Sequence, residues 1–227
     1  MKIDWRREWP VWTLLAALFA MAAMNWSGAP ERIPMHWGLD GRPDGWGGRF
    51  AGLLAIPLEA LGIYALLLFL PRIDPGRANY ASFAWTYTVL RWLVVAFMAV
   101  LQTLIVLAIH GRGPAVNRAV PISAGALFFV LGNLLGKLRP NWFVGIRTPW
   151  TLSSKDSWVR THRAGGWAFM AFGLLMASCG VVQQAAYTIA AGITMAAGLV
   201  ALIVYSYAVW KRDPDKIPPA GTTPAEP

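Results

Sequence analysis

The sequence predicts an all-α, polytopic integral membrane protein with six transmembrane helices and both termini in the cytoplasm (N-in/C-in). Hydrophobic residues make up 56% of the 227 residues and charged residues only 14%, against roughly 25% charged residues in soluble domains. Six apolar segments approach or exceed the ~20 residues that a helix needs to cross a bilayer. Lys and Arg gather in alternate connections between these segments, which is the pattern of cytoplasmic loops.

The first apolar segment is the one whose nature is least obvious. It follows Lys2, Arg6 and Arg7, which resemble the basic start of a signal peptide. Because the run is long and no clean A-x-A cleavage site follows it, we interpret it as a retained first helix. The 13 Trp residues also fit a membrane protein, since indole favours the headgroup layer. The six expected spans are 10–27, 50–70, 84–109, 119–137, 165–183 and 186–210.

The charge distribution predicts the orientation. With a cytoplasmic N-terminus, 14 Lys and Arg residues fall in inner segments and 5 in outer loops, and Arg91 lies within a span. The 28–49 loop is then extracytoplasmic and the 138–164 loop cytoplasmic. The inner cations are Lys2, Arg6, Arg7, Arg72, Arg77, Lys137, Arg139, Arg147, Lys155, Arg160, Arg163, Lys211, Arg212 and Lys216; the outer ones are Arg32, Arg42, Arg49, Arg112 and Arg118.

The net charge of +9 is interpreted as a topology signal and as contact with membrane lipids, not as direct nucleic-acid binding, because the cations lie between apolar runs. The single cysteine, Cys179, excludes a disulfide within the chain. No phosphate-binding Gly loop, nucleophile elbow or metal motif is found, so we expect no cofactor, no metal and no catalytic residue.

The expected 138–164 loop holds the main candidate site. Gly132 and Gly136 are four residues apart, a spacing that lets a neighbouring helix approach, and Ser153 with Asp156 fits a capping box. Gly145 is free to adopt a positive φ, which permits a tight reversal. Arg147 and His162 would form the polar centre of a docking surface or ligand pocket. The competing interpretation is an interfacial loop that only ties two spans together. The candidate residues are Asn133, Lys137, Asn141, Gly145, Arg147, Thr148, Pro149, Trp150, Thr151, Trp158, Thr161, His162 and Arg163.

The outer loop contains His36, Asp40, Asp44 and Trp46. His36 and Asp40 could bind a metal if they lay four apart on a helix, but the surrounding glycines favour a structured non-helical loop. Asp44 and Gly45 are expected to form a turn. This loop is the place where an extracellular peptide could bind.

Two ionisable residues are expected inside the membrane, Glu59 and Arg91. A carboxylate at that depth costs about 2.5–3.5 kcal/mol on insertion scales. The favoured interpretation is a Glu59–Arg91 pair, or a protonated Glu59, that locks spans two and three. The alternative is a proton or cation pathway centred on Glu59.

Several of these residues also resemble the signature of the SdpI immunity-protein family. The resemblance rests on Gly132-Asn133, Lys137, Pro140-Asn141, the run from Gly145 to Leu152, Trp158 and Thr161-His162-Arg163. The run from Ile33 to Gly48 and the segment from Pro71 to Pro75 are similar to a small uncharacterised domain that often precedes the SdpI region. Together these similarities cover residues 10–75 and 115–210.

The resemblance implies a six-helix protein of the bacterial cytoplasmic (inner) membrane that gives immunity to a secreted toxic peptide and recruits a cytoplasmic repressor. We therefore expect a toxic peptide as the partner of the outer face and a repressor protein as that of the inner loop. The alternatives are a small ion-coupled transporter centred on Glu59 and a membrane-embedded enzyme that uses Arg147 and His162.

The expected organisation has four parts. These are a two-helix region at 1–75, a third span within 76–110, an SdpI-like three-helix region at 111–210 and a disordered tail at 211–227.

Overall fold

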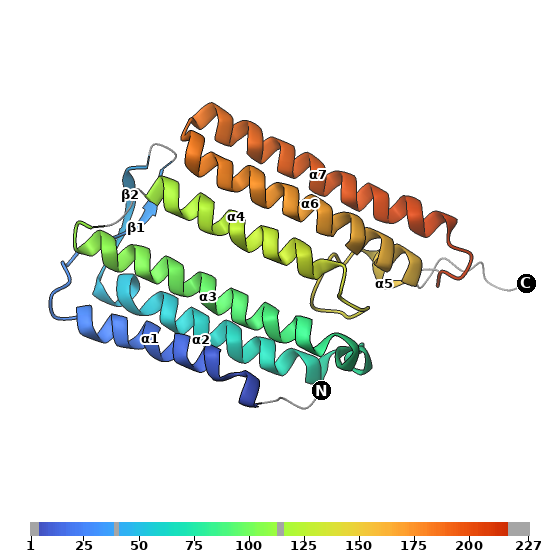
Figure 1. The fold of residues 1–227 in the computed structure, drawn as a ribbon, viewed down its shortest axis with the longest axis horizontal. Helices are drawn as coiled ribbons and strands as arrows, with labels where there is room; N and C mark the ends of the chain where they lie inside the picture. Colours follow the sequence, from blue (N-terminus) through green and yellow to red (C-terminus); the bar gives the residue numbers. More distant parts are fainter. Residues whose placement is uncertain (1–4, 39–40, 113–115, 218–227) are drawn as a thin grey trace, which may run out of the picture.

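The protein is an elongated bundle of six long helices, seen in a computed structural model that describes residues 5–38, 41–112 and 116–217. Figure 1 shows that the helices run nearly parallel to the long axis and form two groups. The first group is α1 (Trp9–Asn25), α2 (Arg49–Ile73) and α3 (Ala84–Ile109); the second is α4 (Val116–Leu135), α6 (Lys155–Val182) and α7 (Ala185–Arg212).

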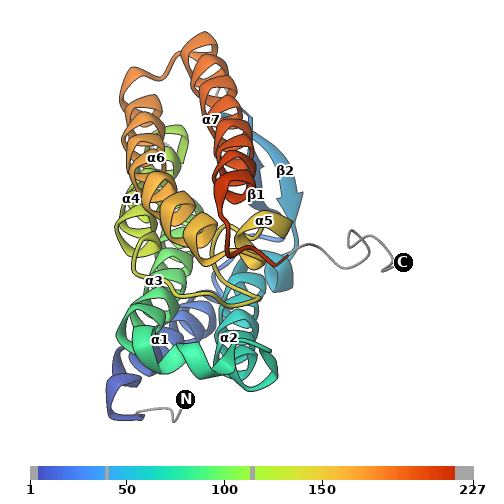
Figure 2. The same cartoon turned by 90° about the vertical axis from the view of Figure 1, so that its right-hand side faces the viewer.

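Short elements occupy the two ends of the bundle (Figures 1 and 2). We call one the hairpin end, because it carries strands β1 (Ile33–Trp37) and β2 (Pro43–Gly47). The other is the loop end, where the 136–154 loop lies with the first and last residues that the structure describes. The 3-10 turns η1 (Trp5–Arg7) and η2 (Arg77–Phe83) and the single-turn helix α5 (Pro149–Leu152) also lie there.

The helix lengths confirm an all-α polytopic membrane protein. Within the described residues, five helices are long and apolar enough to cross a bilayer: α2, α3 with its preceding η2, α4, α6 and α7. The remaining long helix, α1, is apolar but has 17 residues. The fifth predicted span, 165–183, covers the later part of α6, which begins at Lys155.

The first group of helices packs around an apolar core that includes Val11, Leu18, Tyr64 and Val95. A second cluster lies toward the hairpin end, where Ile33 of β1 is buried against Leu53 and Ile105. A Cβ added at Gly52 of α2 would meet the Ile33 side chain at 2.7 Å. The hairpin is therefore seated on the first group and does not hang free.

Glycines bring α4 and α6 into direct backbone contact. A Cβ added at Gly132 would lie 2.6 Å from the carbonyl oxygen of Gly166, and one at Gly173 would lie 2.5 Å from that of Gly125. The contacting glycines are seven residues apart on each helix, two turns of an antiparallel pair. Gly132 behaves as predicted, but Gly136 is exposed, and a Cβ there would come no closer than 4.0 Å to Arg163.

The outer loop forms an antiparallel hairpin, which confirms a structured non-helical segment. Asp44 and Gly45 were predicted to turn but lie within β2, opposite His36. The chain reverses closer to Gly41, whose φ of +76° suits glycine. A Cβ there would lie 2.7 Å from the Asn117 side chain, so the turn rests on the start of α4 and connects the two groups of helices.

Candidate functional site

The 136–154 loop is shaped by Asn141, whose side chain is almost fully buried. Its Oδ1 accepts the N–H groups of Phe143 and Val144 at 3.0 and 2.7 Å. Its Nδ2 donates to the carbonyl oxygens of Arg139 and Val144, both at 2.9 Å. All its hydrogen-bonding capacity toward the loop is used, so Asn141 organises the loop from within.

Asp74, which directly follows α2, ties this loop to the first group of helices. Its carboxylate accepts the Trp142 N–H at 3.1 Å, the Tyr80 hydroxyl at 2.8 Å and the Gly76 N–H at 2.6 Å. Asn79 adds a bond from Nδ2 to the Pro140 carbonyl oxygen at 2.7 Å. Sequence reasoning did not select Asp74. Its signals in the sequence were its place in the Pro71–Pro75 segment and its position between a helix end and a proline.

His162 fastens the same loop to α6. Its Nε2 accepts the Ile146 N–H at 3.0 Å, which makes Nδ1 the protonated nitrogen that donates to the Trp158 carbonyl oxygen at 2.8 Å. The ring stacks on Trp158 at 4.0 Å, and the Trp158 Nε1 donates to the Leu138 carbonyl oxygen at 3.1 Å. Both His162 nitrogens are thus committed to the fold.

Gly145 makes this arrangement possible. Its φ is +116°, and a Cβ would lie 2.3 Å from the His162 Nε2. A side chain at this position would be strained by the backbone and would displace the imidazole. The predicted freedom of Gly145 therefore has a specific purpose, the close passage of the loop over His162.

The loop also reaches α7 through two caps. Thr148 and Thr151 form a capping box at α5, and the Thr148 hydroxyl lies 3.0 Å from the Ser206 hydroxyl. The predicted Ser153–Asp156 box is wrong: Ser154 caps α6, accepting the Ser157 N–H at 2.9 Å. Because an N-cap accepts from two or three residues ahead, moving the cap by one residue removes Asp156 from the reciprocal position.

Ser154 makes a further contact, to the end of α7. Its hydroxyl donates to the Asp213 Oδ2 at 2.5 Å. This hydrogen bond lowers the pKa of the Asp213 carboxyl below its usual value, because it favours the charged form. The segment after α7 is held at the same corner by a bond from the Ile217 N–H to the Ser153 carbonyl oxygen, at 2.9 Å.

The thirteen candidate residues separate into two sets, with Gly145 and Trp150 half-buried between them. Arg147 is exposed and donates from Nη1 to the Trp142 carbonyl oxygen at 2.8 Å, while Lys137 bonds to the Asn133 side chain at 3.2 Å. The predicted centre is therefore divided, with His162 inside the fold and Arg147 on the surface. The buried set is Asn141, Thr148, Thr151, Trp158, Thr161 and His162; the exposed set is Asn133, Lys137, Arg147, Pro149 and Arg163.

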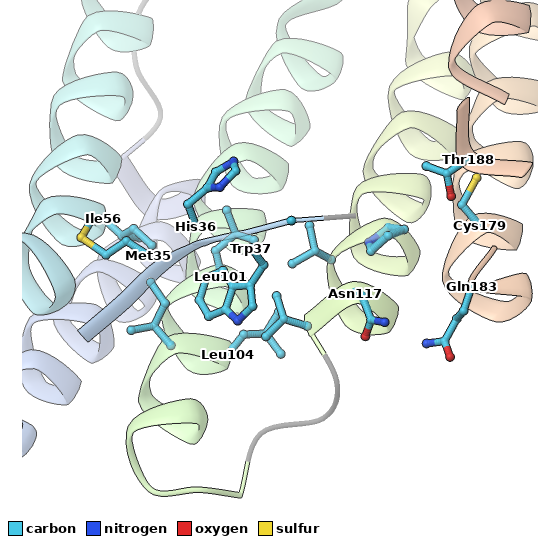
Figure 3. A pocket seen from close by; sticks show the side chains of 15 residues that line it. Met35, His36, Trp37, Ile56, Leu101, Leu104, Asn117, Cys179, Gln183 and Thr188 are labelled. Carbon is cyan, nitrogen blue, oxygen red and sulfur yellow. The ribbon is translucent and has the colours of Figure 1, made fainter. Parts of the chain in front are cut away.

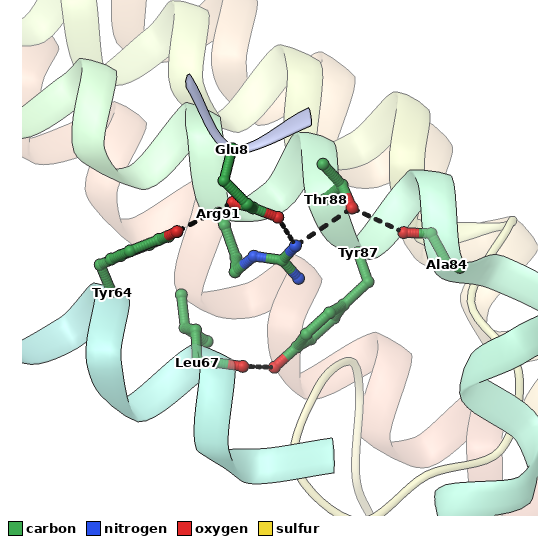
Figure 4. A network of polar contacts seen from close by, with 7 residues as sticks. All are labelled: Glu8, Tyr64, Leu67, Ala84, Tyr87, Thr88 and Arg91. Atoms are coloured by element: carbon green, nitrogen blue, oxygen red, sulfur yellow. Dashed lines mark hydrogen bonds and ion pairs between the residues drawn. The ribbon is translucent and has the colours of Figure 1, made fainter. Parts of the chain in front are cut away.

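The predicted Glu59–Arg91 pair is wrong. Arg91 is buried and forms an ion pair with Glu8, just before α1, as Figure 4 shows. The Tyr64 hydroxyl donates to the other Glu8 oxygen at 3.0 Å, and Arg91 also donates to Thr88 at 3.1 Å. Glu59 instead has an exposed side chain on α2. Glu8 was missed because it precedes the apolar run and is 83 residues away from Arg91.

At the hairpin end, the His36 Nδ1 and the Asp44 Oδ1 lie 2.5 Å apart, and both side chains are largely exposed. Trp46 is also exposed, with Arg32 5.6 Å above its ring. Asp40 lies outside the described residues. No group of three possible metal-binding side chains occurs among the residues that the structure describes.

Below the hairpin lies a cavity of about 420 Å³, shown in Figure 3. Its lining comes from both groups of helices and from β1. The wall is mainly apolar, with amides and a hydroxyl on the side of the second group. The lining residues include Trp37, Leu101, Leu104, Val120, Asn117, Cys179, Gln183 and Thr188.

Two family matches fall on different parts of the chain, one mainly on the first group of helices and one mainly on the second. Residues 13–61 match a domain of unknown function, DUF1648, and residues 137–208 match the SdpI/YfhL protein family. The first covers α1, the hairpin and the start of α2, and the second runs from the 136–154 loop to near the end of α7. No solved structure matches the chain.

A characterised relative supports the same assignment. The Immunity protein SdpI of Bacillus subtilis (strain 168) is 26% identical over 150 residues, which cover 65% of this chain and 69% of the relative. The sequence motifs predicted both matches. The chain is therefore a multi-pass bacterial membrane protein similar to SdpI, in which a segment that matches DUF1648 precedes one that matches the SdpI/YfhL family.

Proposed function

We propose that this protein protects the cell from a secreted toxic peptide and signals the encounter to the cytoplasm. In this proposal the hairpin end faces outward and the loop end faces the cytoplasm, as the distribution of Lys and Arg favours. The similar protein of Bacillus subtilis is an immunity protein, which supports the protective role.

The observation that carries the proposal is the division of the candidate residues into a buried set, which fastens the 136–154 loop to α6 and α7, and an exposed cationic face. Both ring nitrogens of His162 form hydrogen bonds within the fold: Nδ1 donates to the Trp158 carbonyl oxygen, and Nε2 accepts the Ile146 N–H. It is therefore not placed to accept a proton from a substrate, which a general base must do. Lys137, Arg147 and Arg163 remain on the surface, so the geometry favours a docking surface over an active site.

A second cavity, of about 970 Å³, supports the binding of a cytoplasmic partner at the loop end. It is lined by Asn79 and Ser82 of η2, by Arg139 in the loop and by the α5–α6 corner near Lys155. A cytoplasmic repressor bound there would touch both groups of helices at once. A change in their relative position would then alter its affinity, which is the requirement for coupling between two sites.

The hairpin end holds a cavity in which the toxic peptide would bind. The cavity below the hairpin is also shared by the two groups of helices, and the turn at Gly41 rests on Asn117 of α4. A peptide held in this cavity would bias the same relative position from the opposite end. We propose that this is how protection and signalling are linked.

The experiment is a survival assay in the native host. Cells that lack the gene are exposed to spent medium from the parent strain grown to high density, and colony counts are compared with those of complemented cells. Loss of survival in the deletion strain, restored by the intact gene, is the expected result. Equal survival of deleted and complemented strains in all growth phases would overturn the protective role.

The signalling arm has its own readout. Membranes that contain the protein are mixed with cytosol from the parent strain before and after exposure to spent medium, and the proteins retained are identified by mass spectrometry. A DNA-binding repressor retained only after exposure supports the proposal. Retention that is unchanged by exposure would leave protection without signalling.

A further inference from the structure

The cavity below the hairpin is bordered by only one of the two strands. Met35, His36, Trp37 and Gly38 line it, whereas no described residue of β2 does. In Figure 3 β1 runs across the cavity, with the Trp37 ring and the His36 ring on opposite sides of the strand. The cavity therefore lies against β1.

The edge of β1 that does not pair with β2 offers main-chain carbonyl oxygens and N–H groups, except at Pro34, which has no N–H. The sheet has two strands, and β1 pairs with β2 from Ile33 opposite Gly47 to Trp37 opposite Pro43. Among the described residues, the structure gives no main-chain hydrogen bond on the other edge of Ile33–Trp37. An unpaired strand edge is a ready template for an extended segment.

The hairpin is held firmly enough to act as such a template. Ile33 is fully buried, and the Gly41 turn rests on the Asn117 side chain. Both ends of the strand pair are therefore anchored, one on each group of helices. A segment that binds beside β1 would not first have to order it, which lowers the entropic cost of binding.

The opposite wall suits alternating side chains. Leu101, Leu104 and Val120 supply apolar surface, and Asn117 and Gln183 supply amides near the same space. In an added strand, successive side chains point to opposite sides, so alternate residues would enter the cavity. A volume of about 420 Å³ falls within the usual range for ligand sites.

We infer that this cavity binds an extended, alternately apolar segment of a peptide as a third strand along the free edge of β1. This inference rests on the proposed function, because it names how the outer face would recognise a secreted peptide. Main-chain hydrogen bonds to β1 supply affinity, and the apolar wall selects the alternate side chains.

Cys179 gives a direct readout, since it lines the cavity and is the chain's single cysteine. The full chain in detergent is treated with methyl methanethiosulfonate, and the modification of Cys179 is followed by mass spectrometry. The probe is an acetylated and amidated peptide of seven residues, alternating Thr and Leu. We expect it to slow the modification by about threefold once about two-thirds of the sites are filled.

The matched probe is the same peptide with every backbone amide N-methylated. It keeps the side chains but cannot pair along a strand edge, so Cys179 should react at the unliganded rate. Equal protection by the unmodified and methylated peptides would overturn strand addition. Protection by lauric acid, with none by either peptide, would assign the cavity to a lipid chain instead.

Two variants locate the effect. Val120→Phe fills part of the cavity and should abolish protection by the unmodified peptide. Val200→Phe adds the same group on α7, where Val200 is 60% exposed, and should leave protection unchanged. Protection that survives Val120→Phe would place the peptide elsewhere, and loss of protection in both variants would show that the effect is not specific to the cavity. A protein that secures cell survival but shows no difference between the peptides would retain the proposed function and refute this site.

Discussion

His162 shows how a residue predicted to contact a ligand or partner can instead hold the site together. Replacing it by Ala would leave the Ile146 N–H without its acceptor and a gap beside Trp158. An unsatisfied buried donor costs about 1–3 kcal/mol, and the lost ring contacts add to this. We predict that His162→Ala lowers the midpoint of thermal unfolding in detergent, measured by size exclusion after heating. An unchanged midpoint would mean that the loop does not depend on this ring.

Arg147 is the better candidate for contact with a partner. Of its five N–H groups, the structure uses one, in the bond to the Trp142 carbonyl oxygen. Lys can copy that single bond but not a two-pronged contact with a carboxylate. We predict that Arg147→Lys keeps normal expression and thermal stability but impairs repressor retention. Lys211→Ala, which is also exposed and lies outside the second cavity, should have little effect on either. Full retention by Arg147→Lys would reduce its role to lipid contact.

The Glu8–Arg91 pair is fully buried. Removing one partner of such a pair costs about 3–5 kcal/mol because the other charge is left uncompensated, whereas replacing both is often neutral. We predict that Arg91→Met strongly destabilises the protein and that Glu8→Gln with Arg91→Met recovers most of the loss. Thermal unfolding of the two single variants and the double variant measures the coupling. Additive effects of the two changes would exclude a direct pair.

At the scale of elements, the α4–α6 contact depends on the absence of side chains. A Cβ at Gly173 would lie 2.5 Å from the Gly125 carbonyl oxygen, which is backbone and cannot turn aside. We predict that Gly173→Ala separates the helices and sharply lowers the amount of folded protein. Gly192→Ala on α7 is the matched control, since nothing lies within 4 Å of its added Cβ; it should be neutral or stabilising by about 0.5–1 kcal/mol. Equal yields of the two variants would contradict the close packing.

Element prediction from this sequence succeeded where a local pattern determines the structure. Apolar length located the long helices, and Gly145 was correctly expected to be free for positive φ, which only glycine readily adopts. Prediction failed where the partner is distant. Nothing local connects Glu8 with Arg91 or Asp74 with Trp142. The cap at Ser154 was missed by one residue because two serines stand side by side, and the choice depends on Asp213.

At the scale of the whole molecule, the two groups of helices meet at both ends through polar or glycine-dependent contacts. At the loop end these contacts centre on Asp74 and at the hairpin end on Gly41. The sequence predicted a docking surface on one face and a structured loop on the other. It could not predict that each would span both groups, since that follows from the packing of α3 beside α4 (Figure 1).

Both proposed binding sites, for the peptide outside and for the repressor inside, depend on the predicted orientation of the molecule in the membrane. In the structure, the connections alternate between the two ends of the bundle, and the 136–154 loop lies at the same end as the first and last described residues. The members of the inner set of Lys and Arg that the structure describes belong to segments at this loop end. Fourteen cations against five is a strong bias toward retention in the cytoplasm.

Reporter fusions test this orientation directly. Alkaline phosphatase, active only outside the cytoplasm, should be active after residues 40, 112 and 184 and inactive after 75, 150 and 215. Green fluorescent protein at the same positions should give the opposite pattern, which controls for expression. Phosphatase activity at 150 would invert the two faces. The cavity below the hairpin would then open toward the cytoplasm, and a secreted peptide could not reach β1 from outside.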